Sequence, residues 1–276
     1  MKVPTTEFDI VFMSYDEPNA DKNYADLIEK APWAKRVHGV KGFDACHKAA
    51  ANAAETDRFI TIDADNIVRP EFFDIELDMS KIGKNDVISW GGKNAVNGLV
   101  YGNGGIKLWP KHVVEQMKTH EAAEDESSQV DFCWDIFYYQ MNNVYCDVYN
   151  NASAYQAWRA GFREGVKLTL QQGNVVDPRK IKQLTHEKNY KRLLVWASVG
   201  ADIENGIWAM YGTRLGIYMS NLARDTFDYV SVRDYDWCDA FWDQSIKPQF
   251  TENATERCIA TGWMYNKKKL ELEIGR

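Results

Sequence analysis

Two aspartates, Asp63 and Asp65, stand one residue apart directly after the apolar run Arg58–Ile62. In an open α/β sheet, ligands bind beyond the carboxyl ends of the strands, where such a run would place both acids. Strand alternation would point the side chains at i and i+2 the same way, so that they could hold one hard cation. A divalent metal bridging a diphosphate would offset their mutual repulsion and stabilise charge on a leaving group. A solvated turn is the alternative, because Asp-x-Asp turns are frequent.

Alternating strands and helices are expected to position these acids. Short apolar runs indicate buried strands, whereas helical spacing and runs of small residues indicate helices. The predicted order is a strand at Phe8–Tyr15, a helix at Asn23–Lys30, a strand at Lys35–Val40, a helix at Phe43–Glu55 and a strand at Arg58–Ile62. This alternation predicts an α/β fold with a mostly parallel sheet flanked by helices.

The later chain is predicted to extend this sheet and then to become helical. The acidic segment Glu121–Ser128 is the best candidate for a mobile loop. The remaining elements are a strand at Val87–Trp90, the glycine-rich stretch Leu99–Leu108, a helix opening at Pro110, a helix at Asp131–Gln140, a strand at Val144–Tyr149 and a helix at Tyr155–Leu170. No repeat or linker is visible, so the chain divides only weakly near residue 170. Residues 1–170 would form the core and residues 171–276 a helical, tryptophan-rich extension.

Composition excludes several classes of protein. The 276 residues are 45% apolar and 26% charged, which indicates a globular chain and excludes disorder and collagen. No run reaches the roughly 18 apolar residues of a membrane span, and the start lacks the layout of a signal peptide, so an intracellular protein without membrane contact is expected. Five cysteines without a C-x-x-C pair indicate neither disulfides nor a thiolate zinc site. A net charge of −7 disfavours a broad polyanion-binding surface but leaves a local basic groove open.

The stretch Lys41–Asn66, KGFDACHKAAANAAETDRFITIDADN, resembles the nucleotide-binding half of GT-A glycosyltransferases, especially their large inverting family. In that family a glycine leads a helix of small residues, an acidic residue ends it, and a hydrophobic strand presents Asp-x-Asp. The order and the spacing agree, and the resemblance extends over about residues 7 to 150. It implies the Rossmann-like GT-A fold.

The resemblance also implies roles for single residues. Asp65 would be a metal ligand and Asp63 a ribose or metal contact. The residues that would line the nucleotide pocket are Tyr15, Asp16, Glu17 and Lys41, and Gly104 and Gly105 would lie against the donor sugar. The residues alone leave other interpretations open: a simple turn after Tyr15, a surface charge at Lys41, and a glycine pair that serves hairpin geometry.

The catalytic base matches the family less well. Family members place two acids at the start of a helix, followed by an Asp-Leu-Cys-like run and a strand. The run Asp131–Trp134 and the strand after it match, but Ser128 and Gln129 stand where the acids belong. Asp131 is therefore the candidate base, with two acids of the predicted loop as substitutes, Asp125 and Glu126.

A second candidate base is Glu164, which stands beside Arg163 and one turn before Lys167. Its alternative is an exposed ion pair on a helix. Family members often complete the metal shell with a late histidine. His186 is the only late histidine here, and its helical surroundings favour a position facing solvent.

Three longer strings, YGNGGIKLWP, GFREGVKL and WASVGADIENG, look like those of tailed-phage proteins described as glycosyltransferase-like. This likeness implies that the acceptor is a 5-hydroxymethyl-pyrimidine in DNA, with a glycan or a small molecule as the alternative. Aromatic rings could stack on a flipped base and lysines could contact phosphates, although tryptophans also build cores. The residues concerned are Trp237, Trp242, Trp263, Tyr265 and Lys267–Lys269.

The expected function is transfer of a sugar from a nucleotide-sugar, with a UDP-sugar favoured, to a hydroxyl acceptor with the help of Mn²⁺ or Mg²⁺. A nucleotidyltransferase ranks lower, because the loop after Tyr15 carries acids instead of glycines and arginine. A non-catalytic nucleotide-sugar-binding protein is the third possibility, because Ser128 and Gln129 replace the expected acids. The location would be the cytoplasm, of the host if the protein is viral. Donor sugar, stereochemical outcome and oligomeric state stay open.

Overall fold

The computed structural model describes residues 1–101, 105–119, 121, 136–171, 174–177, 180–221 and 223–250. The chain separates into two compact units, Met1–Ala122 with Cys133–Tyr149, and Ala123–Phe132 with Asn150–Arg276. After Tyr149 the chain passes from the first unit into the second, whereas the sequence indicated a weak boundary near residue 170. The long helix that follows this point therefore belongs to the second unit.

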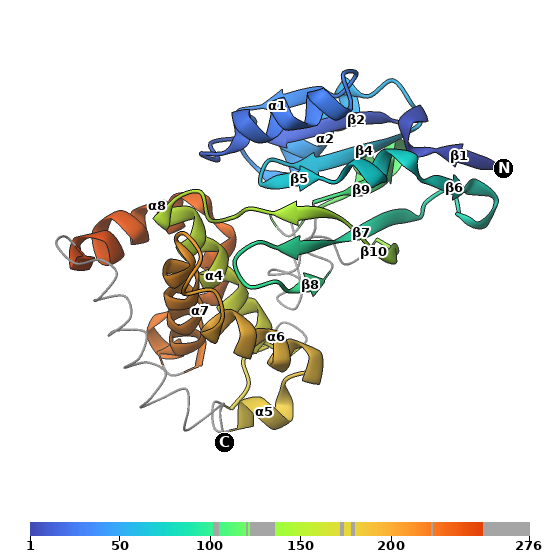
Figure 1. The fold of residues 1–276 in the computed structure, drawn as a ribbon. Coiled ribbons are helices and arrows are strands. Elements are labelled where there is room, and N and C mark those ends of the chain that lie inside the picture. The colour runs from blue at the N-terminus through green and yellow to red at the C-terminus, as the bar shows by residue number, and fades with distance from the viewer. Residues whose placement is uncertain are drawn as a thin grey trace. The chain divides into compact units, whose positions relative to one another are not determined.

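The first unit begins with the predicted alternation of strands and helices (Figure 1). The elements are β2 (Asp9–Ser14), α1 (Ala20–Lys30), β3 (Lys35–His38), α2 (Phe43–Ala53) and β4 (Arg58–Asp63). Strand β2 is parallel to both β3 and β4. Helix α2 buries Ala50 and Ala51, whose small side chains let a helix approach a sheet closely. The carboxyl ends of β3, β2 and β4 therefore lie at one edge of the sheet.

The described residues form a mixed sheet of eight strands, in the order β3-β2-β4-β9-β7-β10-β5, with β8 paired to β7. The further strands are β5 (Asn66–Val68), β7 (Val87–Asn94), β8 (Val100–Tyr101), β9 (Lys107–Pro110) and β10 (Tyr138–Val148). The α/β class is thus confirmed, but the sheet is mixed where a mostly parallel one was predicted. The main reason is that β9 runs antiparallel to β4 and to β7, its two neighbours.

The helix predicted at Asp131–Gln140 is wrong in its described part. Tyr138–Gln140 begins β10 and pairs in parallel with Val87–Ser89 of β7. Aromatic residues favour a strand when a neighbouring strand is available to pair with them, and this partner lies far away in the sequence. Helix α3 (Lys111–Gln116) does begin directly after Pro110, as predicted.

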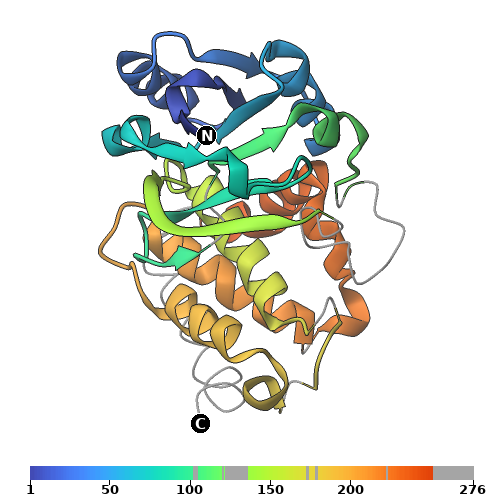
Figure 2. The same cartoon turned by 90° about the vertical axis from the view of Figure 1, so that its right-hand side faces the viewer.

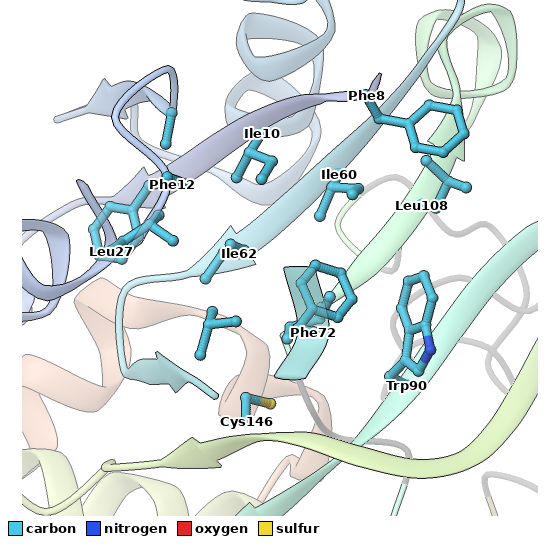
Figure 3. Close-up of a cluster of buried hydrophobic side chains, with 14 of the residues drawn as sticks. Phe8, Ile10, Phe12, Leu27, Ile60, Ile62, Phe72, Trp90, Leu108 and Cys146 are labelled. Atoms are coloured by element: carbon cyan, nitrogen blue, oxygen red, sulfur yellow. The ribbon is translucent and has the colours of Figure 1, made fainter. Parts of the chain in front are cut away.

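A second sheet of two antiparallel strands, β1 (Lys2–Pro4) and β6 (Glu76–Asp78), accompanies the first. Short 3-10 turns flank its strands: η1 (Thr5–Glu7), η2 (Pro70–Asp74) and η3 (Met79–Lys81). One cluster of buried apolar side chains in the first unit lies on one face of the large sheet. Figure 3 shows Ile10, Ile60 and Leu108 from β2, β4 and β9, with Phe72 and Trp90 near them, and all of these side chains are buried. This packing fixes the strands whose ends carry the candidate site.

The described residues of the second unit are mainly helical, as predicted for residues 171–276 (Figure 2). Its α-helices are α4 (Ala154–Thr169), α5 (Ile181–Leu184), α6 (Glu187–Ser198), α7 (Gly206–Asn221) and α8 (Tyr235–Phe241). Shorter helical turns are η7 (Arg224–Thr226), η8 (Tyr229–Arg233), the π-turn η9 (Trp242–Ile246) and η10 (Lys247–Phe250). No helix of the described residues is long and apolar enough to cross a membrane.

Helices α4 and α7 cross with their backbones in contact. A Cβ atom on Gly161 would lie 1.9 Å from the carbonyl oxygen of Ala209, and one on Gly212 would lie 2.2 Å from that of Trp158. Real side-chain carbons cannot approach a carbonyl oxygen so closely, so glycine is required at both positions. The same contact recurs one turn further along each helix, at Gly165 and Gly216.

Candidate functional site

Asp63 and Asp65 lie at the carboxyl end of β4, beside the end of β2. The strand ends at Asp63, and Ala64 and Asp65 form a tight turn into β5. The alternation expected from a continuous strand therefore does not extend to Asp65. Burial and then the charges of Asp65 and Asp63 raise the pKa of the buried Cys146 thiol to about 12.

The turn Asp63–Asp65 is held by hydrogen bonds to its backbone. Asn23 of α1 is buried, and its Nδ2 donates to the carbonyl oxygen of Ala64 at 2.8 Å. The backbone nitrogen of Tyr149, at the end of β10, donates to the carbonyl oxygen of Asp65 at 2.7 Å. A turn fixed from a helix and from a strand places its carboxylates in advance, which is what a binding site requires.

Asn66 and Gly105 complete this turn. Asn66 Nδ2 donates to Asp65 Oδ1 at 2.8 Å and to the carbonyl oxygen of Asp63 at 3.3 Å, while its Oδ1 accepts from the Gly105 nitrogen at 3.4 Å. A Cβ atom on Gly105 would lie 2.6 Å from Asp63 Oδ2 and 2.5 Å from Asn66 Nδ2. Gly105 is therefore required by its contact with the aspartate turn, whether or not it also faces a donor sugar. Gly104 lies outside the described residues.

The surroundings of Asp63 oppose its ionised form. Burial raises the pKa of the Asp63 carboxyl, and the positive charge of Lys107 offsets part of this rise. Lys107 lies on β9, where it pairs with Thr61 of β4. No spacing in the sequence indicates a role for Lys107 here, because only the antiparallel register of β9 brings this residue near Asp63. A cation bound beside Asp63 would stabilise the ionised form of this carboxyl group.

Helix α2 begins at this edge with Gly42, whose φ of 94° is a conformation that favours glycine. Glu121 Oε2 accepts a hydrogen bond from the Asp44 nitrogen at 3.1 Å, so a carboxylate lies at the positive end of the helix. In return, Asp44 Oδ1 accepts from the Thr119 nitrogen at 2.8 Å. Lys41 is exposed directly before Gly42.

The pKa of the Cys46 thiol, in the first turns of α2, indicates which charges act on this part of the sheet edge. Its pKa is raised to about 12, first by burial and then by three negative charges, those of Asp63, Glu17 and Glu121. Because Coulomb effects fall with distance, all three charges lie within reach of the start of α2. Two of these acids, Asp63 and Glu17, belong to the predicted nucleotide pocket, and Glu121 is a third.

The loop after β2 contains a hydrogen bond between two of its own residues. Glu17 Oε2 accepts a hydrogen bond from the Tyr15 nitrogen at 2.8 Å, which fits the simple turn considered for this segment. The Tyr15 side chain is 38% exposed, and Asp16 is also exposed. The Tyr15 ring and the Asp16 carboxylate are therefore open to a ligand at this edge.

The candidate catalytic residues that the structure describes belong to the second unit. Glu164 and Arg163 lie on α4 of the second unit, where Glu164 Oε1 pairs with Lys167 Nζ at 3.0 Å. The Glu164 side chain is only 12% exposed, so the ion pair considered as its alternative is present but largely buried. Outside the described residues lie Asp131, the loop acids Asp125 and Glu126, and Ser128 and Gln129.

The late aromatic residues that are described pack within the chain. Trp237 stacks on Phe241 with ring centroids 4.9 Å apart, and Trp242 lies 5.4 Å from Trp158. His186 is exposed and caps α6, with its Nδ1 accepting from the Lys188 nitrogen, as its helical surroundings indicated. Outside the described residues lie Trp263, Tyr265 and Lys267–Lys269.

Asp63 and Asp65 are the residues that could hold a divalent cation. Among the residues that the structure describes, no group of three or more His, Cys, Asp and Glu side chains could hold a metal ion. Mg²⁺ is often bound by only one or two carboxylates together with water and substrate phosphates. The two fixed aspartates therefore fit a cation that binds together with a diphosphate better than one enclosed by protein ligands.

No model of a known protein family matches this chain, and no curated protein matches it either. Its function is therefore inferred from its own residues.

Proposed function

We propose that this chain is a metal-dependent glycosyltransferase that moves a sugar from a nucleotide-sugar to a hydroxyl acceptor. The observation that carries the proposal is the aspartate turn: Asp63 and Asp65 are fixed at the carboxyl end of β4, with Gly105 pressed against them. Ligands of open α/β sheets bind at this edge. The turn is also the part of the chain that most resembles GT-A enzymes.

The strand directions support a GT-A arrangement within the α/β class. Strands β3, β2 and β4 are parallel, and so are β7 and β10. Because β9 is antiparallel to both β4 and β7, those two strands run in the same direction. Five strands of the sheet thus share one direction, and β9, β5 and β8 run against them. The five strands of common direction are the part of this mixed sheet that supports the proposal.

Each residue of the proposed site has a separate proposed role. Asp63 and Asp65 would hold Mn²⁺ or Mg²⁺, which supplies Lewis-acid stabilisation of the leaving diphosphate when bound. Lys107 and Lys41 would add positive charge beside the phosphates. Asp131 remains the proposed base that takes the proton of the acceptor hydroxyl, because Glu164 would first have to release Lys167.

The acceptor is proposed from the sequence likeness to phage proteins: a 5-hydroxymethyl-pyrimidine in DNA. Trp237 already stacks on Phe241, and Trp242 packs at a tilt against Trp158, so their side chains support this acceptor less than the sequence indicated. A glycan or a small molecule is the alternative. Mass measurement of a hydroxymethylcytosine duplex after incubation with nucleotide-sugars and Mn²⁺ separates these acceptors.

Substitution of Asp65 tests the metal role. We expect Asp65→Ala to abolish metal-dependent thermal stabilisation by nucleotide-sugars, and donor hydrolysis with it, because one of only two metal ligands is lost. The measurement is a thermal-shift screen of nucleotide-sugars with and without Mn²⁺, followed by a hydrolysis assay. Asp74→Ala is the matched control, because Asp74 is an exposed aspartate at the end of η2.

Undiminished activity of Asp65→Ala would contradict the proposal. Metal-dependent binding without turnover on any acceptor would instead favour a non-catalytic nucleotide-sugar-binding protein. Transfer of a nucleotidyl group to a sugar phosphate would identify a nucleotidyltransferase.

A further inference from the structure

A polar cluster that the proposed function does not use lies at the same edge of the sheet. Ser14 ends β2, His38 ends β3, and the two residues are paired in the parallel ladder. Ser14 Oγ lies 2.9 Å from His38 Nδ1. Arg36 reaches both residues: its Nε donates to Ser14 Oγ at 2.9 Å, and its Nη2 lies 3.3 Å from His38 Nδ1.

The Arg36 guanidinium is itself held in place. Its Nη1 pairs with Asp21 Oδ1 at 2.8 Å, and its central carbon lies 5.2 Å from the ring centroid of Tyr24 and 5.9 Å from that of Phe12. A guanidinium stacked on rings and paired with a carboxylate has little freedom to turn away. The cluster is therefore a fixed set of donors around one ring nitrogen.

The contacts of Arg36 and Ser14 determine which nitrogen of the His38 imidazole carries the proton. A guanidinium can only donate, so Arg36 Nη2 requires His38 Nδ1 to be an acceptor. Ser14 Oγ already accepts a hydrogen bond from Arg36 Nε. The Ser14 hydroxyl can donate its own proton to His38 Nδ1, 2.9 Å from Oγ, or to the Val37 carbonyl oxygen, 3.5 Å from Oγ. All these contacts are satisfied when Nδ1 carries no proton. The neutral imidazole then carries its proton on Nε2.

The position of His38 relates it to the aspartate turn. On β2, Met13 pairs with Asp63 on one side and the next residue, Ser14, pairs with His38 on the other. The backbones of Asp63 and His38 are thus two strand spacings apart, roughly 10 Å, at one edge of the sheet. Between them the chain leaves β2 through Tyr15, whose ring is partly exposed. The His38 side chain is exposed as well.

We infer that Arg36 and Ser14 lock His38 as the neutral Nε2–H tautomer, and that this N–H donates a hydrogen bond to an oxygen of the nucleobase when a nucleoside diphosphate is bound at Asp63 and Asp65. This inference rests on the proposed function, because the diphosphate at the aspartates brings the base to His38. His38 acts as a specificity-determining residue, and Arg36 and Ser14 are positioning residues.

The tautomer is tested first, without a ligand. Long-range ¹H–¹⁵N correlation spectra of the full chain, labelled at histidine and recorded at neutral pH, should show His38 with an unprotonated Nδ1 and a protonated Nε2. The His38 signals are assigned by their loss in His38→Ala. In Ser14→Ala combined with Arg36→Gln, the fixed tautomer should give way to a mixture. A wild-type His38 protonated on Nδ1, or an unchanged spectrum of the double variant, overturns the inference.

The ligand contact is tested with two probes, UDP and inorganic pyrophosphate, each with Mg²⁺. We expect His38→Ala to weaken UDP binding between about 2-fold and 10-fold, the range of one net hydrogen bond, and to leave pyrophosphate binding unchanged. His112→Ala is the control, because His112 is exposed on α3 and contacts Asn85 instead. Circular dichroism verifies that each variant is folded.

A third variant distinguishes failure of this inference from failure of the proposed function. Asp65→Ala should weaken binding of both probes. If Asp65→Ala weakens both and His38→Ala weakens neither, His38 does not contact the base and the inference fails alone. If Asp65→Ala weakens neither probe, or if the wild-type chain binds neither, the proposed function fails and the ligand contact of His38 fails with it.

Discussion

His47 is a buried residue of α2 whose protonation is coupled to folding. Its Nδ1 lies 2.8 Å from the Phe43 carbonyl oxygen, which can only accept, so the neutral ring carries its proton on Nδ1. The ring packs edge-on against Trp109 with centroids 5.7 Å apart. Burial lowers the pKa of His47 from 6.5 to about 4, and the charge of Lys107 contributes in the same direction.

This pKa predicts how stability depends on pH. Between pH 6.5 and about 4 the unfolded chain binds a proton that the folded chain does not, so the free energy of unfolding falls as the pH falls through this range. The loss attributable to His47 is about 3 kcal/mol at most. Urea unfolding at several pH values should show a smaller loss for His47→Gln than for the wild type. His112→Gln, at an exposed histidine, should keep the wild-type slope, and equal slopes for all three proteins would contradict the prediction.

At the residue scale, the sequence indicated the acids of the site but not their surroundings. Asp63 and Asp65 were predicted at the end of a strand, because an apolar run followed by acids is a local signal. Asn23, Lys107 and Glu121 were missed. Each of them reaches the site through a contact between segments far apart in the chain, and no spacing within the sequence reports such a contact.

At the scale of elements, local patterns were sufficient where an element carries its own signal. The helices and strands from β2 to β4 were predicted within a few residues, because glycine, proline and apolar periodicity mark their ends. Strand β10 was partly mistaken for a helix, and the reversal at β9 was not foreseen. Both depend on which strand is available as a neighbour, and pairing of strands distant in the sequence is decided by the whole sheet.

The crossing of α4 and α7 gives a prediction about these two helices. In Gly161→Ala, the added methyl group would lie 1.9 Å from the Ala209 carbonyl oxygen, so the helices must separate. We expect a loss of about 3 kcal/mol in the free energy of unfolding, measured by thermal or urea unfolding. Gly91→Ala is the matched control, because a Cβ there would meet nothing closer than 3.5 Å. Equal stability of the two variants would show that the helices cross less closely.

At the scale of the whole molecule, the aspartate turn of the proposed site and the helices α4 and α7 belong to different units. Helix α4 was assigned to the first region from its position in the sequence, but its glycines match those of α7, some fifty residues later. A partner at that distance leaves no local signal. The aspartate turn, the start of α2 and His38 all belong to the first unit.

Ligand binding should therefore act on the two units unequally. With UDP and Mg²⁺ at 100 times the dissociation constant, the binding unit gains about 2.7 kcal/mol by mass action. Hydrogen exchange should slow at the turn between β4 and β5, at the end of β2 and at the start of α2, and stay unchanged in α4 and α7. The pattern should be absent in Asp65→Ala and present in Asp74→Ala. Equal slowing throughout both units would contradict this assignment.

The rings packed between α4, α7 and α8 give the second unit an optical property of its own. Trp242 lies 5.4 Å from Trp158 and 5.2 Å from Trp208, and Trp158 lies 5.1 Å from the ring of Phe162. Indole rings held in fixed packing give near-ultraviolet circular dichroism, which is lost when the packing is lost. Melting of this ring cluster should therefore appear as a loss of near-ultraviolet signal, to which the buried Trp90 and Trp109 of the first unit contribute as well.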